Sequence, residues 1–205
     1  LSYSVEVFGQ KSYNGVANIT KNGSTQTSKG ISGLVDPQTR VISTTHKDVR
    51  VVNVYVPNGQ AVGSEKFDYK LSWLKHLKKM LKDDLKKHPK MVVLGDFNIA
   101  PSDQDVHDPE KWKDKILCSA QERTMFEDIL SLGFKDSFRL FEKEAGFHSW
   151  WDYRTAAYTK ELGLRIDLLL ISNELVPLCK KSYIDEKPRW LERPSDHTPV
   201  VVELN

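Results

Sequence analysis

The segment Met91-Val92-Val93-Leu94-Gly95-Asp96-Phe97-Asn98 decides the fold class of this 205-residue chain. Its first four residues form a short apolar run, which is typical of a buried strand. Asp96 and Asn98 then follow two positions apart, so their side chains leave an extended chain on the same side. An aspartate at a strand end is also a common turn residue, and Ile99–Asp103 could supply such a turn. The segment therefore predicts a buried strand that ends in either a turn or a polar site.

Helical and strand patterns alternate along the rest of the chain. Apolar residues recur at three- and four-residue steps from Phe67 to Leu85, which predicts an amphipathic helix. A second helix is expected at Ser119–Leu132, with Gly133 as its left-handed cap. Elements in this mixed order indicate a layered α/β sandwich whose strand-end loops meet on one face. Strands are predicted at Ser2–Phe8, Gly15–Thr20, Val41–Thr45, Val49–Val56, Met91–Leu94, Arg165–Ser172 and Val200–Leu204.

The composition is that of an ordinary globular protein, with 39% hydrophobic and 28% charged residues, and the length fits one domain over residues 1–205. A net charge of +2 is too small to indicate a polyanionic partner, so a nucleic-acid function has to rest on a site. No stretch reaches the apolar length of a membrane span. Cys118 and Cys179 lack the spacing of a zinc site, and we expect reduced core thiols of a cytoplasmic protein, or at most one disulfide.

The segment from Lys66 to Lys90 is rich in lysine, a feature also found in DNA-binding helices. The lysines fall on the face opposite the leucines, and Asp83 and Asp84 dilute their charge. We therefore expect a solvated outer face rather than a DNA-binding stripe. The lysines concerned are Lys70, Lys75, Lys78, Lys79, Lys82, Lys86, Lys87 and Lys90.

Two further strand ends carry polar residues that suit catalysis. Asp167 interrupts an otherwise apolar strand, where an unpaired carboxylate is costly to bury. An ion pair with Arg165 is the alternative, which we disfavour because side chains alternate between faces along a strand. Asp196 and His197 stand between two prolines just before the last strand, and such a pair can bind a hard cation or handle a proton. A purely structural histidine is the alternative there.

Two aromatic segments are candidates for contact with substrate. Asn53–Gly59 ends a strand with Tyr55 and then Asn58, a pair suited to face a phosphate, although Tyr55 could equally be strand packing. His148–Arg154 is dense in aromatic side chains that can stack on sugars or bases, while its arginine meets phosphate. Core packing is the alternative for this segment.

In this order, the segments resemble the exodeoxyribonuclease III family of apurinic/apyrimidinic endonucleases, in the superfamily that also holds deoxyribonuclease I and inositol polyphosphate phosphatases. The resemblance runs from Tyr13 to the C-terminus. It implies a four-layered α/β sandwich of two packed mixed β-sheets flanked by helices, with the site at one end. The superfamily shares the motifs Gly95-Asp96-Phe97-Asn98 and Ser195-Asp196-His197; the family adds Asn53–Asn58, Ser149–Arg154 and Gly163–Asp167.

The resemblance implies a DNA-repair nuclease. The expected reaction is Mg²⁺-dependent hydrolysis of the phosphodiester 5′ to abasic sites in double-stranded DNA, with 3′-to-5′ exonuclease and 3′-phosphatase activity. One divalent ion and several donors can stabilise the charge that develops on a phosphoryl group. The roles implied are that Asp96 orients or deprotonates the attacking water, Asn98 and His197 hold the phosphate, Asp167 orients His197, and Tyr55 lies by the phosphate or leaving oxygen.

The same resemblance implies the ligands of the ion and the contacts with DNA. Asp96, Asn98, Asp196 and His197 are expected to hold Mg²⁺ or Mn²⁺, which prefer oxygen ligands. The expected substrate contacts are Trp150, Leu164 and Ile166, which would wall an apolar pocket for a flipped-out abasic sugar, and Tyr13, Asn58 and Arg154, which would contact the DNA backbone.

The sequence departs from the family at its N-terminus. The family's domain begins with a strand that carries an asparagine and continues to a Gln-Glu-x-Lys motif, and neither precedes the strand-like sequence that opens at Leu1. We therefore expect an N-terminally incomplete domain that binds Mg²⁺ weakly. A catalytically impaired DNA-binding fragment and a phosphatase of inositol phosphates are the alternatives. The second is disfavoured by Trp150–Tyr153 and by the apolar pair Leu164 and Ile166. The expected form is a monomer whose partner is duplex DNA with abasic sites or 3′-blocked ends.

Overall fold

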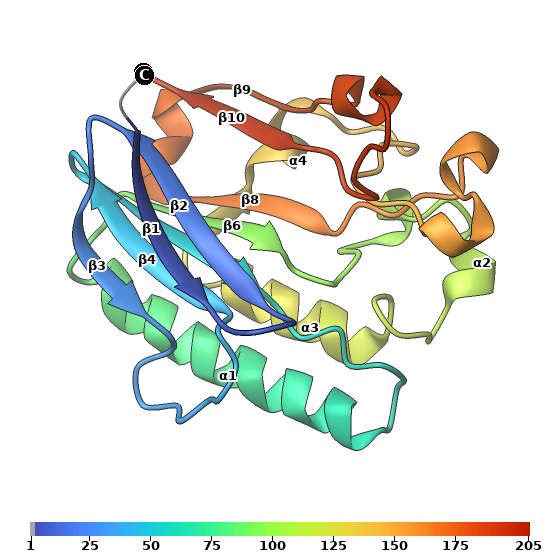
Figure 1. Ribbon diagram of the computed structural model, residues 1–205, viewed down its shortest axis with the longest axis horizontal. Helices are drawn as coiled ribbons and strands as arrows, with labels where there is room; N and C mark the ends of the chain where they lie inside the picture. The colour runs from blue at the N-terminus through green and yellow to red at the C-terminus, as the bar shows by residue number, and fades with distance from the viewer. Residues whose placement is uncertain (1–2) are drawn as a thin grey trace.

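The protein is built on a six-stranded mixed sheet with the strand order β3-β4-β5-β6-β8-β7, as seen in a computed structural model that describes residues 3–205 (Figure 1). The strand pair β5–β6 is parallel, and the other neighbouring pairs are antiparallel. The strands are β3 (Thr25–Lys29), β4 (Val41–His46), β5 (Val49–Tyr55), β6 (Met91–Asp96), β8 (Asp167–Ser172) and β7 (Phe134–Asp136).

Two helices cover one face of this sheet: α1 (Glu65–Leu85) and α3 (Ala120–Leu130). Their apolar sides and the inward residues of the central strands form the main core, in which Trp73 of α1, Phe126 of α3 and Val93 of β6 are buried together. Ser64 caps α1 and Ser119 caps α3, and each side chain accepts a bond from the first helical turn. The apolar spacing read from Phe67 to Leu85 is therefore the packed side of α1.

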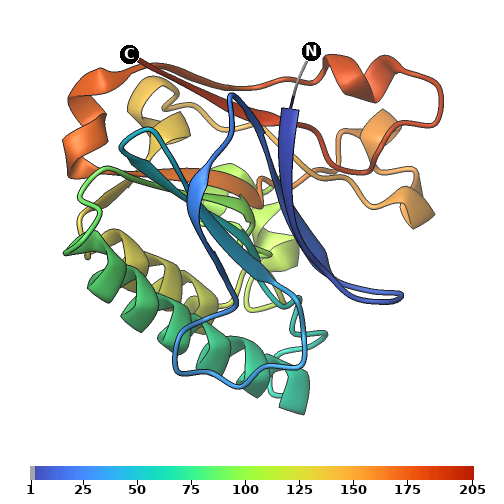
Figure 2. The same cartoon turned by 60° about the vertical axis from the view of Figure 1, so that its left-hand side comes forward.

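The opposite face of the sheet carries two separate two-stranded sheets (Figures 1 and 2). The pair β1 (Tyr3–Gly9) and β2 (Gly15–Lys21) contacts β4 and β5, whereas β9 (Cys179–Ile184) and β10 (Val200–Leu204) lie next to β8. The expected α/β sandwich with two packed layers of strands and flanking helices is confirmed. The remaining helices are short: α2 (Pro109–Trp112), α4 (Ser137–Phe141) and 3-10 segments at Asp103–Asp105, Tyr153–Thr155, Tyr158–Lys160, Asn173–Leu178 and Lys187–Trp190.

All seven predicted strands and both predicted helices are present, with ends that shift by a residue or two. The predicted first strand included Ser2, which lies outside the described residues. Three strands were missed. Strand β3 is exposed at every position and reads Thr-Gln-Thr-Ser-Lys, so it lacks any apolar alternation; β7 has only three residues; and β9 begins directly after a 3-10 segment.

One statement about the lysine-rich helix is wrong. Lys70 does not lie on a solvated face but is fully buried, and its ammonium group forms an ion pair with Glu122. Lys75, Lys79, Lys82 and Lys86 do lie on the exposed side, as expected. The spacing of apolar residues did not predict the burial of Lys70, because α1 has a second buried side near its N-terminus. There α1 also packs on α3 and on the loops that follow β5 and β6.

Both cysteines are free thiols: Cys118 is buried and Cys179 is partly buried. Within residues 3–205, no helix combines the length and the apolar character needed to cross a membrane.

Candidate active site

Three predicted catalytic residues stand side by side in a single register across the sheet. Tyr55 of β5 pairs with Asp96 of the parallel strand β6, and Asp96 pairs with Asp167 of the antiparallel strand β8. Partners in register project from the same face of a sheet, so the tyrosine and the two carboxylates share one side of its edge. Residues that lie about 40 and 70 positions apart in the sequence therefore meet through strand pairing.

The strand end at Gly95 and Asn98 has a backbone that few residues can adopt. Gly95 has a φ of 133°, and a Cβ atom there would lie 2.0 Å from the carbonyl oxygen of Val54 on the neighbouring strand. Asn98 has a left-handed φ of 48°, which is unfavourable for most side chains and tolerated by asparagine. This strand end therefore has both features that the sequence allowed, a turn and a polar site. The chain turns sharply where Asp96 and Asn98 face one another.

Asn98 holds the Asp96 carboxylate from two directions. Its backbone N–H donates to Oδ1 of Asp96 at 2.8 Å, and its side-chain amide donates to Oδ2 at 3.0 Å and to the carbonyl of Val56. The Oδ1 atom of Asn98 accepts from the amide of Asn58 at 3.0 Å. Both amide hydrogens of Asn98 are therefore used inside the protein. In this arrangement Asn98 orients Asp96. To hold a phosphate, which is the role predicted from the sequence, Asn98 would have to give up one of these hydrogen bonds.

His197 and Asp167 form the second half of the site. The Nδ1 atom of His197 lies 2.8 Å and 3.0 Å from the two oxygens of Asp167. A carboxylate only accepts, so Nδ1 carries the hydrogen and Nε2 is left for other contacts. The predicted pairing of Asp167 with His197 is thus present in the structure.

Sequence reasoning missed Ser149, which fixes this pair from behind. Its buried hydroxyl accepts from the backbone N–H groups of Ile166 and Asp167 and donates to Oδ2 of Asp167 at 2.7 Å. A serine between a histidine and a tryptophan gives no signal of its own, so only the fold could show this role.

Charge is concentrated where the strand ends meet. Burial and the neighbouring carboxylate of Asp167 raise the pKa of Asp96 to about 7. Burial by itself would lower the pKa of His197, but the hydrogen bond and the charge of Asp167, together with Asp96 and Asp196, outweigh it and raise that pKa to about 9.

Arg165 is not the partner of Asp167. It points away from the site and makes buried ion pairs with Asp105 at 2.6 Å and Asp136 at 2.7 Å. The alternation argument does not explain this result, because residues two positions apart in a regular strand share a face. The cause is that β8 begins only at Asp167, so Arg165 belongs to the preceding irregular segment.

The three residues predicted to wall an abasic-sugar pocket lie together, and two of them are buried. Trp150 exchanges backbone hydrogen bonds with Leu164, and its indole N–H donates to Asp196 at 3.1 Å. Leu164 and Ile166, however, are only 0% and 2% exposed and pack in a small core with Ala100 and other apolar residues. Of the three residues, only Trp150 is partly exposed, because the loop before β8 turns the other two inward.

The residues predicted to contact the DNA backbone line a shared cavity of about 700 Å³. Tyr13 comes from the β1–β2 turn, Asn58 follows β5, and Arg154 comes from the 150s loop. Arg154 is exposed and forms an ion pair with Asp152. Further basic side chains on the cavity wall are Lys11, Arg40 and Lys66, so the cavity beside Asn58 has the charge that phosphates require.

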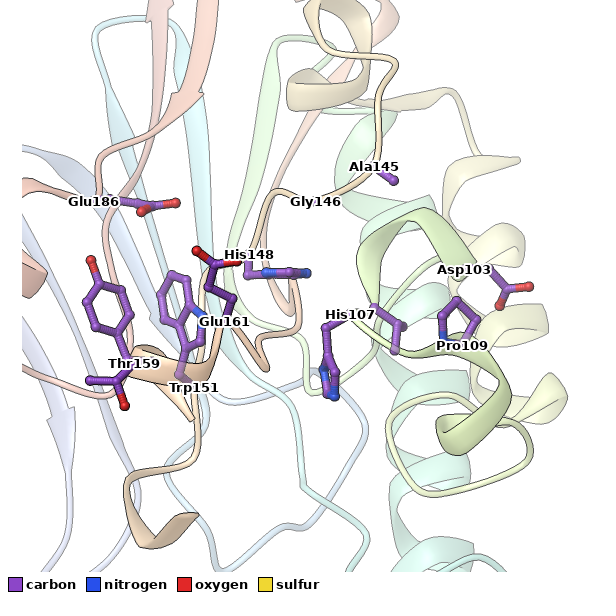
Figure 3. Close-up of a pocket in the computed structure, with 12 residues that line it drawn as sticks. Asp103, His107, Pro109, Ala145, Gly146, His148, Trp151, Thr159, Glu161 and Glu186 are labelled. Carbon is purple, nitrogen blue, oxygen red and sulfur yellow. The ribbon is translucent and has the colours of Figure 1, made fainter. Parts of the chain in front are cut away.

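A second cavity, of about 900 Å³, is lined by His148 and Trp151 of the aromatic segment, but by none of the residues to which the resemblance gives a role (Figure 3). Trp151 and Glu186 lie on one side of it and His107 and Pro109 on the other, with His148 between them. The adjacent Trp150 and Trp151 thus serve different places, since Trp150 borders His197 and Trp151 borders this cavity.

The family model that describes the endonuclease/exonuclease/phosphatase family matches residues 3–197. The chain therefore belongs to the endonuclease/exonuclease/phosphatase family. It is 33% identical over 217 residues to exodeoxyribonuclease III of Haemophilus influenzae, with 100% of this chain and 81% of that protein covered.

Two solved structures are similar over nearly the whole chain. A 3′ phosphatase from Neisseria bound to a product DNA hairpin is 45% identical with a TM-score of 0.97, and 99% of this chain and 79% of that one are covered. An AP endonuclease from Archaeoglobus fulgidus is 34% identical with a TM-score of 0.94 and the same coverage. The expected class is confirmed: a hydrolytic nuclease of the exodeoxyribonuclease III and AP endonuclease type.

Nucleases of this family generally use divalent metal ions. Within residues 3–205, no group of three or more His, Cys, Asp or Glu side chains is arranged to hold an ion. Both oxygens of Asp96 are engaged by Asn98, and Asp196 accepts from Trp150. Three of the predicted ligands, Asp96, Asn98 and Asp196, carry oxygen donors of the right kind, but the predicted residues do not by themselves form a complete cation site.

Proposed function

We propose that the protein hydrolyses phosphate esters in double-stranded DNA, at blocked 3′ ends and on the 5′ side of abasic sites. The observation that carries this proposal is the row of Tyr55, Asp96 and Asp167 in one register, with His197 bonded to Asp167. A phosphate ester needs a positioned water, donors for the developing charge and support for the leaving oxygen. The row offers an acceptor, an imidazole and a phenol at one edge of a rigid sheet.

The roles follow from what each group can donate or accept. Asp96, held by Asn98, accepts a proton from the attacking water, and the oxygen of that water forms the new bond to phosphorus. His197, whose raised pKa keeps the ring protonated, donates its Nε2–H to a phosphate oxygen, because its Nδ1–H is committed to Asp167. Tyr55 stands on the adjacent strand, where its hydroxyl supports the leaving oxygen as the old P–O bond breaks. Asp196 lies at the border of the site, where its carboxylate accepts a hydrogen bond from Trp150.

The DNA strand would enter along the 700 Å³ cavity. Tyr13, Asn58 and Arg154 line it with further basic side chains, and Asn58 is bonded directly to Asn98. Contacts of this kind position a duplex without reading its sequence. The ion proposed for the reaction is Mg²⁺ or Mn²⁺, since the available donors are carboxylate and amide oxygens. We further propose that the protein acts as a monomer in the cytoplasm.

Processing of 3′ ends should be the faster activity. An abasic sugar has to leave the duplex and occupy a pocket, whereas Leu164 and Ile166 are packed away from solvent. A 3′-terminal phosphate needs no such pocket, because the ester lies at an open end. The solved relative described as a 3′ phosphatase supports this order.

The test compares two labelled duplexes, one with a 3′-phosphate at a nick and one with a single abasic analogue. We expect phosphate release with Mg²⁺, none with a chelator, and slower incision at the abasic analogue. Asp48→Asn is a matched control, because Asp48 is exposed and lies at the opposite end of β5 from Tyr55. Gel retardation without any cleavage would indicate only DNA binding. Turnover of a soluble inositol phosphate without turnover of DNA would contradict the proposal.

A further inference from the structure

Lys70 is a buried cation that the site described so far does not use. Its side chain is fully buried, and its three N–H bonds all have acceptors. Two acceptors are backbone carbonyls, that of Asn98 at 2.7 Å and that of Asn58 at 3.1 Å, and the third is the carboxylate of Glu122. An ammonium group has three donors, so the group is saturated.

The three acceptors come from three different parts of the fold. Asn58 follows β5, Asn98 follows β6, and Glu122 lies in the first turn of α3. Glu122 is itself buried and accepts from the backbone of Leu117 and from Ser119 through both its backbone and its hydroxyl. Lys70 therefore joins the loops that carry two site residues to the start of a core helix.

The bond to Asn98 has a clear purpose. Asn98 keeps a left-handed backbone, a conformation that persists only where surrounding contacts hold it. From that backbone its side chain reaches Asp96, and the amide of Asn58 reaches Asn98. A chain of direct contacts thus runs from Lys70 through Asn98 to the Asp96 carboxylate.

We propose that Lys70, paired with Glu122, is a positioning residue for catalysis, which holds Asn98 so that Asn98 orients Asp96. This inference rests on the proposed function of the same site. It also accounts for a charged pair in a place where apolar side chains would pack at no electrostatic cost: a methyl group can fill the space but cannot donate to two carbonyls.

The test has to separate positioning from folding. Lys70→Met by itself leaves Glu122 buried and unpaired, so this variant is expected to lose much of its stability. The double variant Lys70→Met with Glu122→Gln removes both charges and is the informative protein. Lys70→Arg restores a cation with several donors, and Lys75→Met, on the exposed side of the same helix, is the matched control.

For the folded double variant we expect kcat on the 3′-phosphorylated duplex to fall by roughly 10²-fold with little change in KM, because a misplaced catalytic group affects the transition state more than binding. Lys70→Arg should keep most of the kcat that the double variant loses, and Lys75→Met should have the same kcat as the parent protein. A folded double variant with an unchanged kcat would overturn the proposal.

A second readout does not depend on turnover. The side-chain amide of Asn98 donates to Val56 and Asp96, so its ¹H–¹⁵N signals should be protected from exchange in the parent protein. We expect this protection to be lost in the double variant and kept in Lys75→Met. If the parent protein cleaves no phosphate ester, the proposed function fails, yet the amide signals still decide whether Lys70 holds Asn98. Unchanged protection in the double variant would show that it does not.

Discussion

Asp167 and His197 illustrate how little freedom an individual residue has in this site. Asp167 accepts from His197 with both oxygens and from Ser149 with one of them. Ser149 has both lone pairs committed to backbone N–H groups, so its hydrogen can only point at Asp167. The orientation of the imidazole is therefore set through Asp167 by a fully buried serine.

At this scale we predict that Asp167→Asn keeps the fold but lowers kcat by roughly 10²- to 10⁴-fold, the usual range for loss of acid–base assistance. The amide has nearly the same shape but lacks the charge that raises the pKa of His197, so the imidazole is no longer held in its protonated form. Steady-state rates on the 3′-phosphorylated duplex measure the effect, with Asp48→Asn run alongside. Equal rates for the two variants would argue against a role for the Asp167–His197 pair.

Several site residues could be predicted from the sequence, because they lie in short local motifs. Asp96, Asn98, Asp167, Asp196 and His197 stand at strand ends in motifs that a resemblance can match. Ser149, Lys70 and Glu122 act through contacts between distant segments, and no local pattern reports a contact. Ser119 and Glu122 form a capping box at the start of α3, and such a local motif does not show that Glu122 also pairs with Lys70. The burial of Leu164 and Ile166 could not be predicted for the same reason, since a motif does not tell which way a loop turns.

At the scale of the element, β6 depends on the absence of a side chain at Gly95. The residue pairs with Val54 of β5, and its backbone comes so close to that strand that a Cβ atom would overlap the carbonyl oxygen. The apolar run of β6 needs only burial, but its last residues have to bend without leaving the sheet. The element thus combines an ordinary buried strand with an end that only glycine allows.

Gly95→Ala should therefore destabilise the protein by at least about 3 kcal/mol, since the strands have to separate as well as adopt a strained backbone. Gly33→Ala is the control: Gly33 also has a positive φ, of 82°, but nothing lies within 4 Å of an added Cβ. That change should cost only about 1 kcal/mol. Urea unfolding followed by circular dichroism gives both values, and similar losses for the two variants would refute the steric explanation.

For the whole molecule, acid sensitivity should depend on a histidine away from the catalytic row. His148 is 7% exposed, and within the described chain its Nε2 has no hydrogen-bond partner. Burial, with a smaller contribution from the nearby His107, lowers the pKa of His148 to about 4 from an ordinary value of 6.5. Above pH 6.5 the ring is neutral in both the folded and unfolded states. As the pH falls below 6.5, the unfolded chain takes up the proton and the folded protein does not.

The free energy of unfolding should therefore decrease as the pH is lowered from 6.5 towards 4, with a share on the order of 3 kcal/mol from this residue. His148→Gln removes the titration and should flatten the decrease, whereas His76→Gln, a change on the outer side of α1, should leave it unaltered. Denaturant titrations at pH 7, 6, 5 and 4 measure the slopes. Parallel slopes for the parent protein and His148→Gln would rule out this origin.

The register that brings Tyr55, Asp96 and Asp167 together also has a consequence for folding. The strands that carry these residues lie far apart in the sequence and pair only in the folded protein. We expect such pairings to form late in folding, because long loops have to close first. A chain with β5 and β6 paired but β8 still undocked would have most of its secondary structure and no catalytic centre. Recovery of activity during refolding would thus report the docking of β8, and it should lag behind the recovery of helix content.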